Sequence, residues 1–176
     1  MTAIYLSPSV QGNNLFIIGE SEEYYMNRIA DAMIPYLKAS GIGFYRNNPG
    51  STLSQIISRS DVGNNDLHIA LHTSSSPENM TGVLQGPDVY FFTASTKGRR
   101  AAEIISSNLK RIYPDPKLVT VIPTTIFAEL RSTRAPAILV DVAYQDNYTD
   151  AEWVRDNIDE IGKNLAQSAA QYLGVP

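Results

Sequence analysis

The stretch Ala-Ile-Leu-Val-Asp-Val-Ala, residues 137–143, is apolar at every position except Asp141. A continuous apolar run of this length is typical of a strand buried on both faces of an α/β sheet. Four more short apolar runs have a similar character, and they lie at Ala3–Leu6, Ile42–Tyr45, Leu67–His72 and Val89–Thr93. The sequence therefore predicts at least five strands.

Between these runs, apolar residues recur at helical spacing. The spacing predicts helices at Glu22–Ala39, Thr52–Ser60, Gly98–Ile112 and from about Asp150 to Tyr172. We expect Pro35 to kink or shorten the first of these helices, because proline removes a backbone donor. Thr149–Glu152 has the pattern of a capping box that opens the last helix.

Alternation of strands and helices predicts one α/β domain over residues 1–176. We expect a twisted, mostly parallel sheet of about five or six strands, flanked by helices on both faces. A chain of 176 residues with 43% apolar residues can bury a core of this kind. Two polar stretches, 73–87 and 113–128, have no assigned element, and long loops of this sort often carry function.

Charge and hydropathy narrow the classes of partner. The chain has 14 Lys and Arg against 18 Asp and Glu, a net charge of −4, which gives no reason to expect a nucleic acid or an anionic membrane as partner. No apolar run approaches the ~20 residues that span a bilayer. The first residues, Met1–Leu6, lack a basic region and a long apolar region, so we expect no signal peptide.

Cysteine is absent and there are only two histidines. Without cysteine, disulfides, zinc fingers and thiolate nucleophiles are excluded. His68 and His72 lie on one face of the same predicted strand, ~13 Å apart, so they cannot bind the same metal ion. His72 lies at the carboxyl end of the strand and is the candidate ligand, whereas His68 is expected to be packed or hydrogen-bonded.

Several polar residues are expected to meet where the parallel strands end, which is where α/β sheets bind ligands. Gln11 follows the first strand, Glu23 lies at the start of the next helix, and His72 and Asp141 end their strands. The helix dipole alone also favours acidic residues at a helix start. Asp141 needs a partner inside a buried strand, and a structural hydrogen bond explains it as well as catalysis does. Glu129 is expected to pair with a nearby arginine, Arg131 or Arg134.

The same landmarks resemble those of the zinc-dependent N-acetylmuramoyl-L-alanine amidases, the amidase_3 type of peptidoglycan hydrolase. The resemblance runs from Ile4 to about Tyr172. It rests on Glu-Tyr-Tyr-Met-Asn (Glu23–Asn27), Asp-Leu-His-Ile-Ala-Leu-His-Thr-Ser (Asp66–Ser74), the segment Ala135–Asn147 and the last helix with Trp153. The opening Ser-Pro-Ser-Val-Gln (Ser7–Gln11) is similar to a subgroup from sporulating bacteria.

The resemblance implies an activity and a set of site residues. The amide between N-acetylmuramic acid and L-alanine would be hydrolysed, with the peptidoglycan glycan-peptide as substrate. Zinc would be held by Glu23 and His72, with Gln11 near the position of the family's first histidine. Asp141 stands where the family has its catalytic glutamate, and Glu129 is a second candidate carboxylate.

Residues next to these ligands would then line the substrate groove. The candidates are Thr73, Ser74, Tyr144 and Asn147.

Departures from the family pattern leave two other functions open. The first histidine is replaced by Gln11, the catalytic glutamate by Asp141, and Gln145 follows Tyr144 where the subgroup often has histidine. The chain could therefore be a catalytically weakened amidase-fold module that binds wall peptides or a protein partner. A separate, third possibility is a domain that binds a small anion at the helix start near Glu22, although the acidic residues there argue against it.

Overall fold

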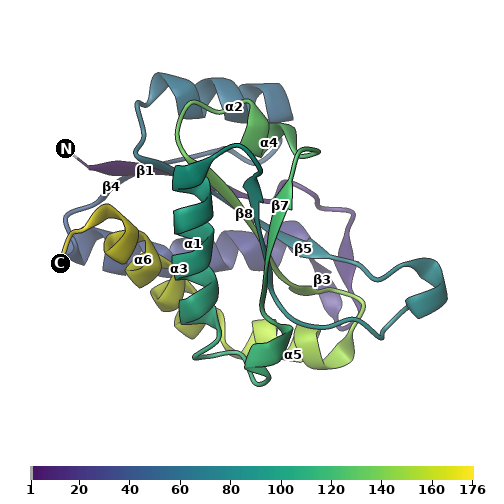
Figure 1. Ribbon diagram of the computed structural model, residues 1–176. Coiled ribbons are helices and arrows are strands. Elements are labelled where there is room, and N and C mark those ends of the chain that lie inside the picture. Colours follow the sequence, from purple (N-terminus) through teal and green to yellow (C-terminus); the bar gives the residue numbers. More distant parts are fainter. Residues whose placement is uncertain (1) are drawn as a thin grey trace.

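The computed structural model describes residues 2–176, and its centre is a six-stranded sheet (Figure 1). The strand order is β4-β1-β5-β8-β6-β7. The first four run parallel to one another, whereas β6 is antiparallel to β8 and parallel to β7. The strands are β1 (Ala3–Pro8), β4 (Gly43–Arg46), β5 (Leu67–Ser74), β6 (Asp88–Phe92), β7 (Thr120–Thr124) and β8 (Ala137–Tyr144). The predicted fold class is confirmed.

Helices cover both faces of this sheet. The elements are α1 (Glu22–Ala39), α2 (Leu53–Val62), α3 (Thr96–Leu109), α4 (Ala128–Arg131), α5 (Tyr148–Asp156) and α6 (Ile158–Leu173). The main apolar core lies between the sheet and α1, α3 and α6, while α2 and α4 lie together over the other face (Figure 1). No helix within residues 2–176 has the length and apolarity to span a bilayer.

Of the two stretches that had no assigned element, 73–87 contains the end of β5 and a short 3-10 helix at Glu78–Met80 and is otherwise a loop. The stretch 113–128 contains β7, a short 3-10 helix at Pro116–Leu118 and the start of α4. The strand β7 is at the edge of the sheet and only partly buried, so its sequence Thr-Val-Ile-Pro-Thr lacks the continuous apolar run of a central strand. A small hairpin of β2 (Leu15–Phe16) and β3 (Gly19–Ser21) also precedes α1.

Pro35 does not shorten α1, which continues to Ala39. Pro35 and Asp31 both lie on the exposed side of the helix. Water can therefore solvate the carbonyl of Asp31, which loses its helical donor at Pro35. The expected shortening is wrong because the lost hydrogen bond is not buried.

The last predicted helix is in fact two helices, and they meet at Asn157. The helix α5 begins after Asn147, whose side chain accepts a hydrogen bond from Asp150 N at 3.1 Å. The expected capping box at Thr149–Glu152 is therefore wrong. Asp150 is fully buried and instead accepts hydrogen bonds from Tyr113 OH, Gly86 N and Tyr144 N.

Close contact between α1 and α6 depends on Gly162. A Cβ atom at this position would lie 2.6 Å from the Cβ of Ala32 and 3.0 Å from the carbonyl oxygen of Ile29. Real Cβ atoms do not approach other atoms this closely, so only glycine lets the two helices pack at this distance.

We expect Gly162→Ala to lower the free energy of unfolding by about 1–3 kcal/mol, the usual cost of overpacking. Alanine has the higher helix propensity, so propensity alone predicts the opposite sign. Chemical denaturation measures the change, with Gln167→Ala at an exposed position of α6 as control. A variant as stable as the parent would contradict the close packing.

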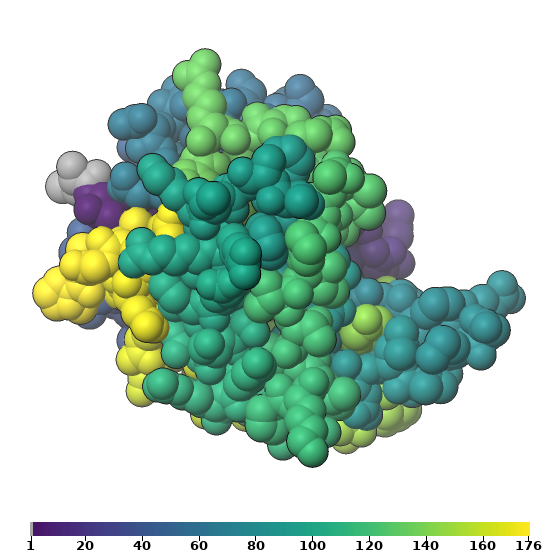
Figure 2. All heavy atoms as spheres, in the orientation of Figure 1, coloured from purple at the N-terminus to yellow at the C-terminus, as the bar shows by residue number. Residues whose placement is uncertain are grey.

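The loop between β5 and β6 projects from the body of the molecule (Figures 1 and 2). Asp146 attaches it to the region after β8, because its carboxylate accepts hydrogen bonds from Ser76 N at 3.0 Å and Gly82 N at 2.7 Å. Burial alone would raise the pKa of Asp146, but the amide donors of Gly82 and Ser76 hold it below the ordinary value.

Removing this carboxylate should loosen the loop. We expect Asp146→Ala to speed hydrogen exchange at Ser76 and Gly82 by on the order of tenfold, with Asp159→Ala, an exposed position, as control. A lowered pKa means that the ionised carboxylate stabilises the folded state above the ordinary pKa. That contribution is lost as the pH falls through the lowered pKa. Unchanged exchange at neutral pH would show that Asp146 does not hold the loop.

Candidate functional site

A cavity of about 510 Å³ lies where β1, β5 and β8 end at their carboxyl edge. The loop after β1, the start of α1, the end of β5, the helix α2 and the segment before α4 form its walls. Its polar lining includes Gln11, Asn14, Glu22, His72, Thr73, Glu129 and Asp141, and its apolar lining includes Leu53, Ile56, Ile126, Phe127 and Leu139. The strand ends thus form the expected ligand position of an α/β sheet.

Glu22 is the carboxylate that contacts His72. Its Oε1 lies 3.1 Å from His72 Nδ1 and accepts a hydrogen bond from Thr73 N at 2.9 Å, while its Oε2 accepts from Asn14 Nδ2 at 3.0 Å. The side chain is buried. Burial would raise the pKa of Glu22, but the bonds from His72, Asn14 and Thr73 hold it below its usual value.

Glu23, which the sequence analysis placed beside His72, points elsewhere. Its Oε2 lies beside Gly12, and Glu23 is not among the residues that line the cavity. Adjacent helical residues point about 100° apart, so only one of the two glutamates can face β5. That residue is Glu22, the first residue after the N-cap Ser21. The expected position of Glu23 is wrong, because the packing of α1 turns Glu22 and not Glu23 toward His72 and Thr73.

Glu129 lies between the two histidines. Its Oε1 is 2.7 Å from His68 Nε2, and its Oε2 is 3.8 Å from His72 Nε2. Burial would raise the pKa of Glu129, but His68 and His72 outweigh it and hold the pKa well below the ordinary range. Burial lowers the pKa of His72, whereas Glu129 and Glu22 raise it, with a net result of about 10. The expected pairing of Glu129 with a nearby arginine is wrong.

His68 is fully buried and hydrogen-bonded, as expected. Its Nδ1 lies 2.8 Å from Ser60 Oγ, and its ring stacks on Tyr5 with centroids 5.2 Å apart. His68 therefore fixes Glu129 from the side away from the cavity.

Asp141 is a buried carboxylate that faces the cavity. It is the cross-strand neighbour of His72 on one side and of Asp88 on the other. Burial is the largest cause that raises the pKa of Asp141, to about 7; His72 opposes the rise and Asp88 adds to it. Among residues 2–176, no group makes a hydrogen bond to this carboxylate, so a structural hydrogen bond does not explain its place in β8.

Gln11 lines the cavity but reaches Glu22 only indirectly. Its side-chain oxygen accepts a hydrogen bond from Asn14, which also donates to Glu22. Asn14 therefore lies between Gln11 and the carboxylate of Glu22.

The four residues expected to line the groove divide into two groups. Thr73 lines the cavity, and its hydroxyl donates to Gln145 Oε1 at 2.8 Å. Ser74 ends β5 and pairs with Tyr144 in β8, outside the cavity lining. Tyr144 donates to Asp88 at 3.0 Å, and Asn147 caps α5 and donates to Gly82 O at 2.8 Å. Tyr144 and Asn147 thus hold the structure around the site.

Glu22 and His72 offer a carboxylate oxygen and an imidazole nitrogen, which are donor types that zinc binds. Oε1 and Nδ1 are joined by a hydrogen bond of 3.1 Å, so both atoms must give up the shared proton to bind one zinc ion. Within residues 2–176, no group of three or more His, Cys, Asp or Glu is placed to hold a metal ion. A third ligand would have to be an amide such as Gln11 or a water molecule.

Known structures share this fold along nearly the full chain. AmiC2, an N-acetylmuramoyl-L-alanine amidase of Nostoc punctiforme, has a TM-score of 0.86 at 16% identity, with 98% of this chain and 97% of that chain covered. The catalytic domain of CwlV, an N-acetylmuramoyl-L-alanine amidase from Bacillus (Paenibacillus) polymyxa var. colistinus, has a TM-score of 0.84 at 15% identity, with 100% of both chains covered.

A third similar structure is the catalytic domain of the CD27L endolysin targeting Clostridia difficile. It has a TM-score of 0.76 at 18% identity, with 97% of this chain and 98% of that chain covered. Identities this low establish the fold alone. Comparison with curated proteins gives no match in sequence.

The sequence itself matches the Amidase_3 family, described as N-acetylmuramoyl-L-alanine amidase, over residues 11–171. This range includes β5, β8 and the start of α1, which supply His72, Asp141 and Glu22. The chain therefore belongs to the Amidase_3 family.

Proposed function

We propose that this protein hydrolyses the amide bond between N-acetylmuramic acid and L-alanine in peptidoglycan. The observation that carries the proposal is the convergence of Glu22, His72, Glu129 and Asp141 on one cavity at the carboxyl edge of the sheet. Membership of the Amidase_3 family supplies the substrate class. The apolar wall formed by α2 and the segment before α4 is suited to the methyl groups of the sugar and of alanine.

Asp141 is the residue placed to move a proton. Its carboxylate is buried at the cavity wall and makes no hydrogen bond within residues 2–176, so its oxygens are free to accept a proton from water. The same group can then return the proton to the nitrogen of the leaving amine. Glu129 is less suited to this task, because its carboxylate is already bonded to His68.

His72 is held in a fixed orientation by the groups around it. Glu22 binds its Nδ1, and Glu22 is itself held by Thr73 N and Asn14. On the other side, the 3.8 Å between His72 Nε2 and Glu129 is longer than a hydrogen bond. The contacts of Glu22 therefore orient the His72 ring at the cavity wall, and fixed groups of this kind can position a scissile amide.

Zinc is the proposed cofactor, and Glu22 and His72 are the residues that would hold it. When bound, a zinc ion supplies Lewis-acid chemistry that lowers the pKa of water and polarises a carbonyl group. Glu22 replaces Glu23 in the ligand set that the resemblance implied. Asn14 is the amide in contact with Glu22, and Gln11 follows behind it.

A binding module without hydrolytic activity is the second candidate function. It is favoured by one observation, the lack of a third His, Cys, Asp or Glu at the pair formed by Glu22 and His72 in the described residues. The same groove would then bind wall peptides or a protein partner without cleaving them.

Replacing Asp141 tests the hydrolase directly. We expect Asp141→Asn to reduce the release of free L-alanine amino groups from peptidoglycan by on the order of 10²-fold or more, because asparagine cannot accept the proton. Asp159→Asn makes the same chemical change at an exposed position and should leave the rate unchanged. Peptidoglycan that binds the parent protein but releases no amino groups would favour the binding module.

Metal analysis tests the ligand set without an activity assay. We expect one zinc ion per chain after dialysis against micromolar zinc, lost in Glu22→Ala and in His72→Ala and kept in Glu23→Ala. The neighbouring glutamates provide a matched pair, since each variant removes one carboxylate from the first turn of α1. Loss of zinc in Glu23→Ala alone would contradict the ligand set, and no zinc in the parent would contradict the cofactor.

A further inference from the structure

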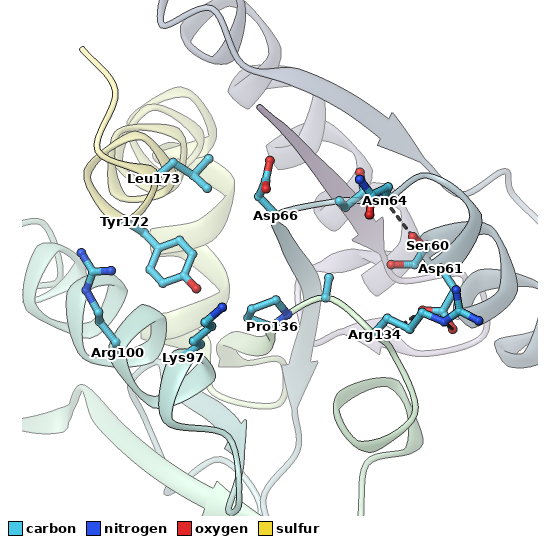
Figure 3. Close-up of a pocket in the computed structure, with 12 residues that line it drawn as sticks. Ser60, Asp61, Asn64, Asp66, Lys97, Arg100, Arg134, Pro136, Tyr172 and Leu173 are labelled. Atoms are coloured by element: carbon cyan, nitrogen blue, oxygen red, sulfur yellow. Dashed lines mark hydrogen bonds and ion pairs between the residues drawn. The ribbon is translucent and has the colours of Figure 1, made fainter. Parts of the chain in front are cut away.

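A second cavity, of about 450 Å³, lies at the amino ends of β5 and β8, at the opposite edge of the sheet from the candidate site. Its walls come from the turn between α2 and β5, the first turns of α3, the segment before β8 and the end of α6 (Figure 3). The two cavities share no lining residue. Amide hydrolysis at the other edge makes no use of it.

One wall of this cavity is positively charged. Lys97 and Arg100 extend from the first turns of α3 (Figure 3). Among residues 2–176, neither has a carboxylate within 4.0 Å. The Arg100 guanidinium lies 5.3 Å from the centre of the Tyr172 ring, which leaves its N–H groups free. The first turn of α3 has no acidic residue, so the positive end of the helix dipole adds to this charge.

The opposite wall carries hydrogen-bond acceptors. Asp61 and Asp66 both line it (Figure 3). Asp66 uses one oxygen to accept a hydrogen bond from Ala3 N at 3.0 Å, and its other oxygen has no donor within residues 2–176. Asp61 is already paired with Arg134 on the same wall: it accepts a hydrogen bond from Arg134 N at 2.8 Å, and Arg134 Nε lies 4.0 Å from its other oxygen. In the described part of the chain, Asp66 is therefore the carboxylate of this wall that keeps a free oxygen.

Opposite charges on facing walls select a ligand that carries both charges. We propose that this cavity binds an amino acid or a short peptide with a free carboxylate and a free ammonium group. The carboxylate pairs with Lys97 and Arg100. The ammonium group donates to the free oxygen of Asp66. An anion alone would satisfy only the first wall, and the cavity volume is in the ~300–1,000 Å³ range of small-ligand sites.

Calorimetric titration of the whole chain with L-alanyl-L-alanine tests the site. Two blocked forms remove one charge each: the N-acetyl dipeptide lacks the ammonium group, and the dipeptide amide lacks the carboxylate. Inorganic phosphate tests for a simple anion site. We expect saturable binding of the free dipeptide, and binding about tenfold weaker or more for each blocked form.

Variants then test which wall binds each charged group of the dipeptide. We expect Arg100→Gln and Asp66→Asn each to weaken binding of the dipeptide by about tenfold or more, whereas Arg99→Gln should leave the binding unchanged. Arg99 is the matched control, because it is on the same helix and pairs with Glu103 at 2.8 Å. No saturable binding of the dipeptide, binding of phosphate as tight as that of the dipeptide, or equal binding to the Arg100→Gln variant would each overturn the proposal.

Discussion

The carboxylate of Glu129, buried between His68 and His72, is the interaction on which the candidate site depends. A buried charge is costly unless charged or polar partners surround it. The partners of Glu129 are the two histidines of β5, so α4, which carries Glu129, must lie against β5. The segment before α4 is thereby held at the wall of the cavity. His68 supplies the fixed side of the contact, because Ser60 and the Tyr5 ring hold it in place.

Carboxylates at the site therefore have different surroundings although they line one cavity. Glu22 and Glu129 are both bonded to histidine, which lowers their pKa. Asp141 has no such bond, and burial raises its pKa to about 7. The groups that hold His72 are thus separate from the group placed to exchange a proton. The two roles fall to different elements of the fold, because Asp141 belongs to strand β8 while Glu22 and Glu129 belong to helices.

Central strands were predictable because their burial requires continuous apolar runs, and β8 is the clearest example. The edge strand β7 was not predictable, since a partly exposed strand does not need a continuous apolar run and can contain Thr and Pro. The different surroundings of the two histidines were also predictable, because strand geometry separates His68 from His72 and leaves His68 buried. The partner of Glu129 was not predictable, since its bond to His68 joins residues 61 positions apart.

By itself, the sequence determined the α/β fold, the position of His72 at a strand end and the shortage of imidazole ligands, because each follows from composition or from strand periodicity. Only the tertiary structure decided that Glu22 and not Glu23 faces His72. Two adjacent helical residues differ by about 100° in direction, and the packing of α1 against the sheet fixes which of them points inward. The charged walls of the second cavity have the same origin, since α2, α3 and α6 bring them together only in the folded chain.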